Sequence, residues 1–175
     1  MALLVAAVVL GTASASADTR FRRDAMDYGG GLDIRAVRHS HGPKASRIRH
    51  TVRMYGNWRS RALRSSHYSI GIYFDINRPR EEREIWIKYR NGKLRAYMVV
   101  LELTRSGKVK DIRRDGSVDV WRPDSRTLRV AFGAGRLNLR RRTYRWSVVL
   151  TPDGVCPGSC ESDFAPESEK ILHRL

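Results

Sequence analysis

The stretch Glu84-Ile-Trp-Ile-Lys-Tyr-Arg-Asn-Gly-Lys-Leu94 decides the fold of this chain. Its first six residues have the alternation of a half-buried β-strand, which places Ile85, Ile87 and Tyr89 on one face. Asn91-Gly92 follows, and this pair is a strong signal for a two-residue hairpin turn because both residues tolerate positive φ angles. The stretch therefore predicts two antiparallel strands, the second of which covers residues 94–103.

Other short segments rich in Val, Ile, Tyr, Trp and Phe recur at roughly ten-residue spacing, separated by turn residues. Helical periodicity is almost absent. The expected strands cover residues 32–37, 47–54, 68–74, 84–89, 94–103, 118–121, 127–132 and 144–150, with a short segment at 109–112. We therefore predict an all-β fold, an antiparallel, jelly-roll-like β-sandwich of about eight or nine strands, with a barrel as the alternative.

The turns between these strands are predicted from residue types that favour chain reversal. Ser106-Gly107 and Asp115-Gly116 each combine a short polar residue with glycine, and each is expected to end a strand. The residues from Asp75 to Glu82 include Asn77 and Pro79 and predict a longer loop. The C-terminal tail is expected to pack back across the sheet.

The first seventeen residues have the pattern of a secretory signal peptide. Residues 1–10 form an apolar run too short to span a bilayer, and small residues ending in Ala15-Ser-Ala17 follow as a cleavage site. No Lys or Arg precedes the run, and a buried apolar helix is the alternative. We expect cleavage after Ala17, a single domain over residues 18–175, and an exported monomer without a membrane span.

The chain has only two cysteines, Cys156 and Cys160, which flank Pro157-Gly158. In an exported protein, the C-x-x-x-C spacing favours a disulfide across a tight turn. A redox-active pair usually has the C-x-x-C spacing, and a metal site would need two more ligands from elsewhere. We therefore expect a structural disulfide between Cys156 and Cys160.

The chain is strongly basic, with 34 Lys and Arg residues against 18 Asp and Glu and a net charge of +16. Such a surface attracts polyanions, among them teichoic acids, acidic polysaccharides, anionic lipid headgroups and nucleic acid. However, 28 of the basic residues are arginines spread along the chain, which also indicates a GC-rich coding sequence. Binding of polyanions by charge alone is therefore an alternative function, and nucleic acid is not the expected partner.

Two clusters have metal-ligand chemistry. His39-Ser-His41 places two imidazoles on one side of an extended segment, but two ligands do not make a site, and solvated histidines at a strand end are the simpler interpretation. Asp75 and Asn77, together with Glu81, Glu82 and Glu84, gather oxygen ligands that suit calcium. Because arginines alternate with these carboxylates, we prefer a hairpin tip joined by ion pairs and predict no metal or other cofactor.

The familiar catalytic motifs do not occur in the sequence. It contains neither a G-x-S-x-G nucleophile elbow nor an H-E-x-x-H zinc motif. Among the 18 acidic residues, no pair is singled out as the two carboxylates of a glycosidase. We therefore expect a binding protein rather than an enzyme.

Aromatic side chains are the strongest functional lead, because exposed rings stack on sugar rings. Alternation along residues 144–150 assigns Tyr144 and Trp146 to the core. Trp86 points away from the apolar face of its strand, and Trp58 lies in an expected loop. Trp58 and Trp86 are therefore the predicted ligand contacts. The other aromatic candidates are Trp121, Tyr55, Tyr73, Tyr89 and Tyr97.

Several short motifs carry a resemblance to known proteins. They are Leu32-Asp-Ile-Arg35, Tyr73-Phe-Asp75, Trp121-Arg-Pro-Asp124, Tyr144-Arg-Trp146, and the cysteine pair followed by Asp163-Phe-Ala-Pro166. In this order they resemble small exported β-sandwich proteins of GC-rich actinobacteria. More distantly, the chain is similar to DOMON-like sandwiches and to the sandwich carbohydrate-binding modules attached to xylanases. The resemblance implies a sandwich fold and carries over neither haem ligands nor sugar contacts.

Charge, cysteine spacing and aromatic pattern together predict a secreted, non-catalytic binding domain for an extracellular glycan or cell-envelope polymer. The alternatives are a polyanion binder that works by charge and a hydrolase whose site is not recognised. Salt separates the first two, because charge-driven binding weakens by orders of magnitude with rising ionic strength and aromatic stacking does not.

Overall fold

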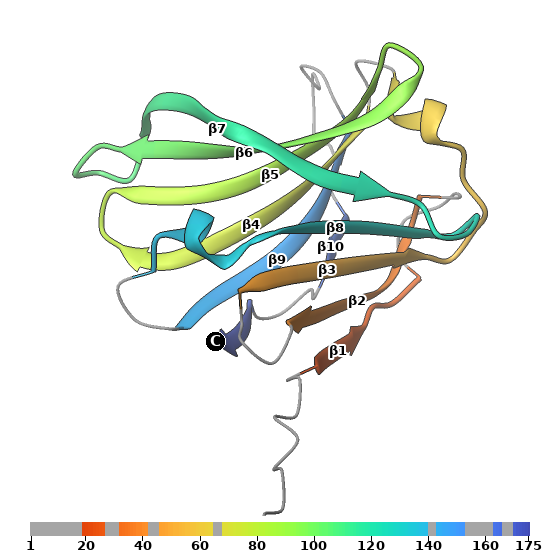
Figure 1. Ribbon diagram of the computed structural model, residues 1–175, viewed down its shortest axis with the longest axis horizontal. Helices are drawn as coiled ribbons and strands as arrows, with labels where there is room; N and C mark the ends of the chain where they lie inside the picture. The colour runs from red at the N-terminus through yellow and green to blue at the C-terminus, as the bar shows by residue number, and fades with distance from the viewer. Residues whose placement is uncertain are drawn as a thin grey trace, which may run out of the picture.

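A computed structural model describes residues 19–26, 32–41, 46–64, 68–139, 143–152, 163–165 and 170–175. Figure 1 shows strands almost throughout, with two short 3₁₀ helices between them. The described strands pair only antiparallel and belong to one sheet. The predicted all-β, antiparallel, single-domain fold is therefore confirmed.

Eleven strands lie within the described residues, which is more than the pattern predicted because three short strands near the chain ends were not expected. In chain order they are β1 (Thr19–Arg23), β2 (Ile34–His41), β3 (Arg47–Met54), β4 (Tyr68–Arg78), β5 (Glu81–Arg90), β6 (Lys93–Leu103), β7 (Val109–Trp121), β8 (Thr127–Gly133), β9 (Thr143–Pro152), β10 (Asp163–Ala165) and β11 (Ile171–Arg174). The helices are η1 (Ser60–Arg64) and η2 (Ala134–Leu137).

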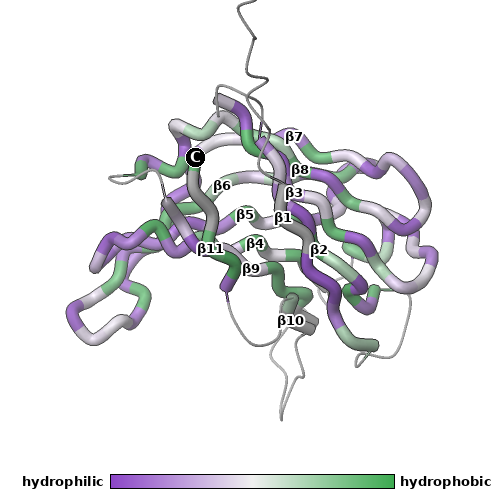
Figure 2. Tube along the Cα trace, turned by 90° about the horizontal axis from the view of Figure 1, so that it is seen from below, coloured by the Kyte–Doolittle hydropathy of each residue, from purple (hydrophilic) through white to green (hydrophobic). Residues whose placement is uncertain are grey.

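The sheet runs in the order β1-β2-β3-β8-β7-β6-β5-β4-β9-β10, with β11 also paired to β9. We term β4, β5, β6, β9, β10 and β11 the large half, and β1, β2, β3 and β8 the small half. Strand β7 joins the halves, since it pairs with β6 along most of its length and with β8 at its end. In Figures 1 and 2 the sheet is seen to curl, so that its two halves enclose the core.

Contacts across the core show which strands face each other. The Tyr144 hydroxyl on β9 lies 3.0 Å from Nδ1 of His39 on β2. The ring of His50 on β3 packs edge-on against the indole of Trp146 on β9, with centroids 4.4 Å apart. The small half therefore covers β9, and the buried aromatic rings between the two halves hold the curled sheet together.

The turn predicted at Asp115-Gly116 is wrong, because β7 continues through it. Gly116 has a φ of +88°, and the register against β6 shifts at this point, from Tyr97 opposite Ser117 to Val99 opposite Arg114. Glycine adopts this left-handed conformation without a Cβ clash, so the pair forms a β-bulge rather than a reversal. A bulge increases local twist, which suits the strand that passes from one half of the sheet to the other.

Two other turns occur where the sequence predicted them. Asn91 and Gly92 have φ angles of +51° and +78°, and Arg90 pairs with Lys93 across the turn. Positive φ at both central residues is the requirement of a type I′ hairpin. Gly107 has a φ of +77° and its N–H donates to the carbonyl of Thr104, which closes the turn between β6 and β7.

The predicted loop from Asp75 to Glu82 is much shorter in the structure, where only Pro79 and Arg80 separate β4 from β5. Asn77 has a φ of +55° and its N–H donates to the Asp75 side chain. Asparagine tolerates this conformation better than most residues. The residues expected to form a loop are therefore part of β4, where they interrupt its regular pairing with β5. Pairing resumes between Arg78 and Glu81.

The interpretation of His39 as a solvated strand-end residue is also wrong, since its side chain is fully buried. The register of β2 against β3 shifts between Ile34 and Ala36, so Ala36 and Val37 are both buried. Beyond this bulge the inward positions follow from Val37, and His39 falls on the core side. The predicted inward face of β3, by contrast, is confirmed from Ile48 to Met54.

The C-terminal tail extends the sheet rather than packing across it, because β10 and β11 both pair antiparallel with β9. Ile171 is buried, whereas Leu172 is half exposed. None of the helices in the described segments has the length and apolarity to cross a membrane. The predicted signal segment 1–17 and the predicted disulfide between Cys156 and Cys160 lie outside the described residues.

Candidate functional site

Three aromatic side chains lie side by side on the outer face of the large half. They are Tyr73 on β4, Trp86 on β5 and Tyr97 on β6, each of them partly exposed. Their immediate neighbours along each strand are buried in the core. Because successive side chains on a strand point to opposite faces, the three rings emerge on the side away from the core. We term these three residues the aromatic platform.

Strand register brings the platform residues together. Trp86 is the cross-strand partner of Tyr97, and their rings meet edge to face with centroids 6.3 Å apart. On its other side Trp86 is the partner of Gly71. The ring of Tyr73 leans over this glycine, since a Cβ placed on Gly71 would lie 2.9 Å from Cε2 of Tyr73. Because Gly71 has no side chain, the Tyr73 ring can lie over it, next to Trp86.

A cation lies over one end of the platform. The guanidinium carbon of Arg114 on β7 is 4.3 Å from the ring centroid of Tyr97. This distance is within the range of a cation–π interaction. Arg114 is exposed, so its guanidinium also presents hydrogen-bond donors next to the aromatic surface.

A buried carboxylate lies beside the platform, on the same face of the sheet. Glu84 is cross-strand partner to Tyr73, and its Oε2 accepts a hydrogen bond from Nε1 of Trp86. Burial raises the pKa of Glu84 above its ordinary value and the nearby Glu82 raises it further, while the hydrogen bond from Trp86 acts in the opposite direction. Burial also raises the pKa of Tyr73 to about 12, with smaller contributions from the charges of Glu84 and Glu82.

These surroundings define what the platform offers to a ligand. The hydrogen bond to Glu84 fixes the plane of the Trp86 indole, so that the ring need not be ordered on binding. With its pKa raised to about 12, the Tyr73 hydroxyl stays protonated well above neutral pH, and it is hence a donor as well as an acceptor. Flat apolar ring faces bordered by a few polar groups match the alternating C–H and hydroxyl surfaces of sugars.

The prediction that Trp58 is exposed is wrong. Its side chain is only 5% exposed and belongs to the hydrophobic core. The guanidinium carbon of Arg122 lies 4.1 Å from the ring centroid, and Nη2 of Arg122 donates to the carbonyl oxygen of Trp58. The N–H of Trp58 also donates to the carbonyl of Ser125. These bonds fold the segment inward, so Trp58 is not available to stack on a ligand.

The two histidines considered as metal ligands, His39 and His41, lie in or beside the core. His39 and His50 are both buried, with ring centroids 4.8 Å apart, and His41 lies 6.0 Å from His39 at the edge of this group. Aromatic rings from both halves of the sheet surround them. Within the described segments, no group of three or more His, Cys, Asp or Glu side chains is arranged to hold a metal ion.

Among the acidic residues considered for calcium, Glu81 is engaged in ion pairs instead. Glu81 contacts both Arg78, at 3.7 Å, and Arg83, at 2.7 Å. Arg83 also contacts Asp115 at 2.7 Å. The preferred interpretation of this region, a hairpin tip joined by ion pairs, is therefore confirmed.

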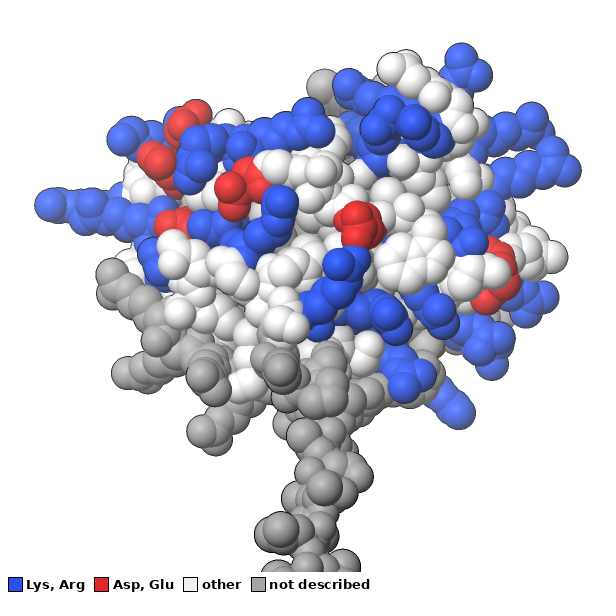
Figure 3. Space-filling model, viewed as in Figure 1, with Lys and Arg blue, Asp and Glu red and all other residues white. Residues whose placement is uncertain are grey.

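The basic side chains are distributed over the surface rather than gathered in one patch. In Figure 3, Lys and Arg side chains are spread over most of the described part of the visible face, and the less numerous acidic side chains lie among them. This agrees with the scattering of arginines along the sequence. A long-range attraction for polyanions follows from such a surface, but no preferred docking position does.

The sequence contains a signal that brings two of the three platform residues together. A two-residue turn at Asn91-Gly92 pairs Arg90 with Lys93, and counting back from this pair places Trp86 opposite Tyr97. Neither Glu84 nor Arg114 has such a signal. The position of Arg114 depends on the bulge at Gly116, and the burial of Glu84 depends on its neighbours in the folded sheet.

No family model, curated protein or solved structure matches this chain.

Proposed function

We propose that this protein is a non-catalytic binding domain that holds a glycan, or a glycan-containing polymer of the cell envelope, on the aromatic platform. Trp86 is the central stacking residue, with Tyr73 and Tyr97 on either side. The observation that carries the proposal is the contiguous row of three partly exposed rings on the outer face of the large half, with the central indole held by Glu84.

The location of the rings supports binding rather than packing. The core already contains a large set of buried aromatic and aliphatic side chains, so these three rings are not needed to complete it. Single exposed apolar residues need no explanation, but a contiguous group of three is typical of a binding surface. A distant likeness to sandwich carbohydrate-binding modules, drawn from short sequence motifs, is compatible with this proposal.

The proposed setting is extracellular. The N-terminal pattern that ends at Ala17 and the cysteine spacing at Cys156 and Cys160 both favour export to an oxidising compartment. An enzymatic role is not proposed, because the carboxylate nearest to the platform, Glu84, is buried in the sheet and tied to Trp86.

A second candidate function is charge-driven binding of polyanions, favoured by the net charge of +16. This function needs no platform and no single contact residue. It makes a different prediction for salt, because release of counterions causes the affinity to fall steeply as ionic strength rises.

The test is a binding array of neutral and acidic polysaccharides and wall polymers, run at low and at physiological ionic strength. Wild type is compared with Trp86→Ala and with the matched control Trp121→Ala. Trp121 is also a partly exposed tryptophan, but it lies at the end of β7 that pairs with β8 of the small half. Binding of a neutral glycan that survives the higher salt and is lost only in Trp86→Ala supports the platform. Salt-sensitive binding that is equal in all three proteins supports charge alone.

A further inference from the structure

We propose a second binding site on this protein, a pocket at the end of the large half that takes a phosphate group carried on a sugar or polyol. The pocket lies between the β4–β5 turn and the β6–β7 turn and has a volume of about 680 Å³. Four cationic and two acidic side chains contribute to its lining. They are Arg78, Arg80, Arg105 and Lys110, and Glu81 and Glu102.

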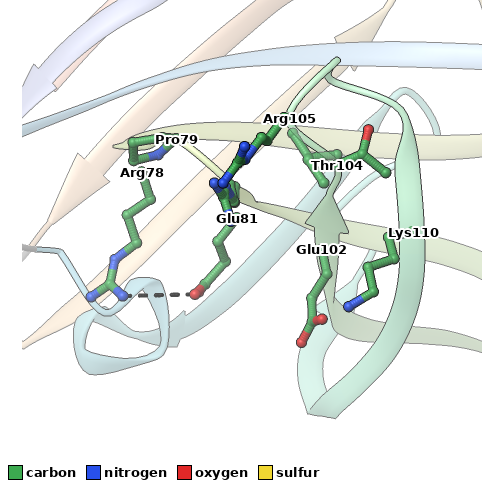
Figure 4. A pocket seen from close by; sticks show the side chains of 9 residues that line it. Arg78, Pro79, Glu81, Glu102, Thr104, Arg105 and Lys110 are labelled. Atoms are coloured by element: carbon green, nitrogen blue, oxygen red, sulfur yellow. Dashed lines mark ion pairs between the residues drawn. The ribbon is translucent and has the colours of Figure 1, made fainter.

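The cations converge from two hairpins that are far apart in the sequence, β4–β5 and β6–β7. Figure 4 shows Arg78 beside Glu81 on one side of the pocket, Lys110 beside Glu102 on the other, and Arg105 between them near Pro79. Arg80 comes from the β4–β5 turn, Arg105 from the chain just after β6, and Lys110 from β7. The fold brings these side chains together although they are distant in the sequence.

Backbone hydrogen bonds hold the two turns that carry the arginines. The N–H of Leu103 donates to the carbonyl of Arg80 at 3.0 Å, which ties the turns to one another. Within the second turn, the N–H of Thr104 donates to the carbonyl of Lys108 at 2.8 Å. Arg80 and Arg105 are therefore anchored on neighbouring, braced pieces of backbone, which lowers the entropy lost when they bind a common group.

The charges in the pocket are unequally compensated. Glu81 is neutralised twice, by Arg78 at 3.7 Å and by Arg83 at 2.7 Å, and Arg78 also donates to the carbonyl of Asn138 at 2.6 Å. For the side chains of Arg80, Arg105 and Lys110, by contrast, no ion pair with another described residue is formed. Three cations thus remain for a ligand, opposed by the single carboxylate of Glu102.

This arrangement suits a phosphate group. The guanidinium fork of arginine matches the oxygens of phosphate, and charge-assisted hydrogen bonds of this kind are stronger than neutral ones. The pocket is larger than a single small ion needs. A phosphate that carries a sugar or polyol would use both the cations and the remaining space.

The pocket is separate from the aromatic platform. Along β5, Glu81 shares the core-facing side with Ile85 and Ile87, whereas Trp86 faces outward. The two sites therefore lie on opposite faces of the large half, and either can fail without the other.

The experiment measures binding of glycerol phosphate and of inorganic phosphate to the full chain by calorimetry. Arg105→Ala is compared with Arg90→Ala, which removes the same charge from the opposite end of the large half, where β5 turns into β6. Arg105→Ala should weaken glycerol phosphate binding about tenfold or more, while Arg90→Ala leaves it unchanged. Glu102→Gln should tighten binding, because it removes the opposing charge.

Three results would overturn the proposal. Equal weakening by Arg90→Ala and Arg105→Ala would show that general surface charge is responsible. Weaker binding in Glu102→Gln would contradict the assigned pocket. Equal affinities for inorganic phosphate and glycerol phosphate would show that the pocket does not recognise the sugar or polyol part of the ligand. Trp86→Ala should bind glycerol phosphate as wild type does, so failure of the platform and failure of the pocket are distinguishable.

Discussion

The indole nitrogen of Trp86 donates a hydrogen bond to the carboxylate of Glu84, its neighbour two positions earlier on the same face of β5. Glu84 is buried, so this bond satisfies an oxygen that would otherwise be costly to remove from water. It also fixes the orientation of the ring at the centre of the platform. The carboxylate is thus a support for the proposed binding surface and a source of pH-dependent stability.

The pKa of Glu84 predicts how stability responds to pH. Because burial raises this pKa, the folded protein holds the proton more tightly than the unfolded chain does. The contribution of Glu84 is therefore most favourable at low pH and is lost as the pH rises through the folded-state pKa. Glu84→Gln removes the cost of ionisation and leaves an oxygen to accept the Trp86 bond, so the variant should be more stable than wild type near neutrality.

This prediction is checked by denaturant unfolding of both proteins between neutrality and the ordinary glutamate pKa of 4.5. The two free energies of unfolding should converge as the pH falls. Glu102→Gln, at an exposed position, is the control and should show no comparable trend. A Glu84→Gln variant that is less stable than wild type at neutral pH would contradict the claim that ionisation of the buried Glu84 carboxyl destabilises the fold.

Gly116 is predicted to be intolerant of a side chain. Its φ of +88° is unfavourable for any other residue, and a Cβ there would lie 2.7 Å from Nη1 of Arg136. That nitrogen donates to the carbonyl of Asp115, so it cannot move without loss of a hydrogen bond. Gly116→Ala should lower the free energy of unfolding by about 1–3 kcal/mol.

A double variant separates the two causes. Arg136→Ala removes the clashing side chain but leaves the backbone conformation as it is. If strain at φ dominates, Gly116→Ala should remain destabilising in the Arg136→Ala background, as measured by urea unfolding. A Gly116→Ala protein as stable as wild type would mean that β7 does not bulge at this position.

Trp58 is predicted to act on stability and not on binding. Truncation of a buried tryptophan to alanine costs about 3–5 kcal/mol, because it removes apolar contacts and leaves a cavity. Trp58→Ala should therefore show a strongly reduced unfolding midpoint in urea, while the fraction that remains folded binds glycan with unchanged affinity. Selective loss of glycan affinity at unchanged stability would reverse the assignment of this residue.

The fold class could be predicted from the sequence because its signals are local. Asn91 and Gly92 have the chemistry of a type I′ turn wherever they occur, and the alternation from Ile48 to Met54 reports directly which side of β3 is buried. The same alternation predicts that Trp86 faces outward, and its side chain is partly exposed in the structure.

The errors arose where a distant partner decided the outcome. Asp115-Gly116 has the composition of a turn, but pairing with β6 and β8 keeps β7 extended through it. Trp58 lies in a segment that looks like an exposed loop, and it is the side chain of Arg122, 64 residues later, that holds it inward. The burial of His39 depends on a bulge between Ile34 and Ala36, which shifts the inward-facing positions of β2 by one residue.

The most direct test of the central claim is the affinity for a neutral glycan found in the array, measured for wild type and for Trp86→Ala at physiological ionic strength. The account predicts that Trp86→Ala weakens binding by about 2 kcal/mol, or roughly thirtyfold, as expected for truncation of a central aromatic contact. Trp121→Ala should bind as wild type does. Equal affinities of wild type and Trp86→Ala would contradict the claim that the aromatic platform is the glycan-binding surface.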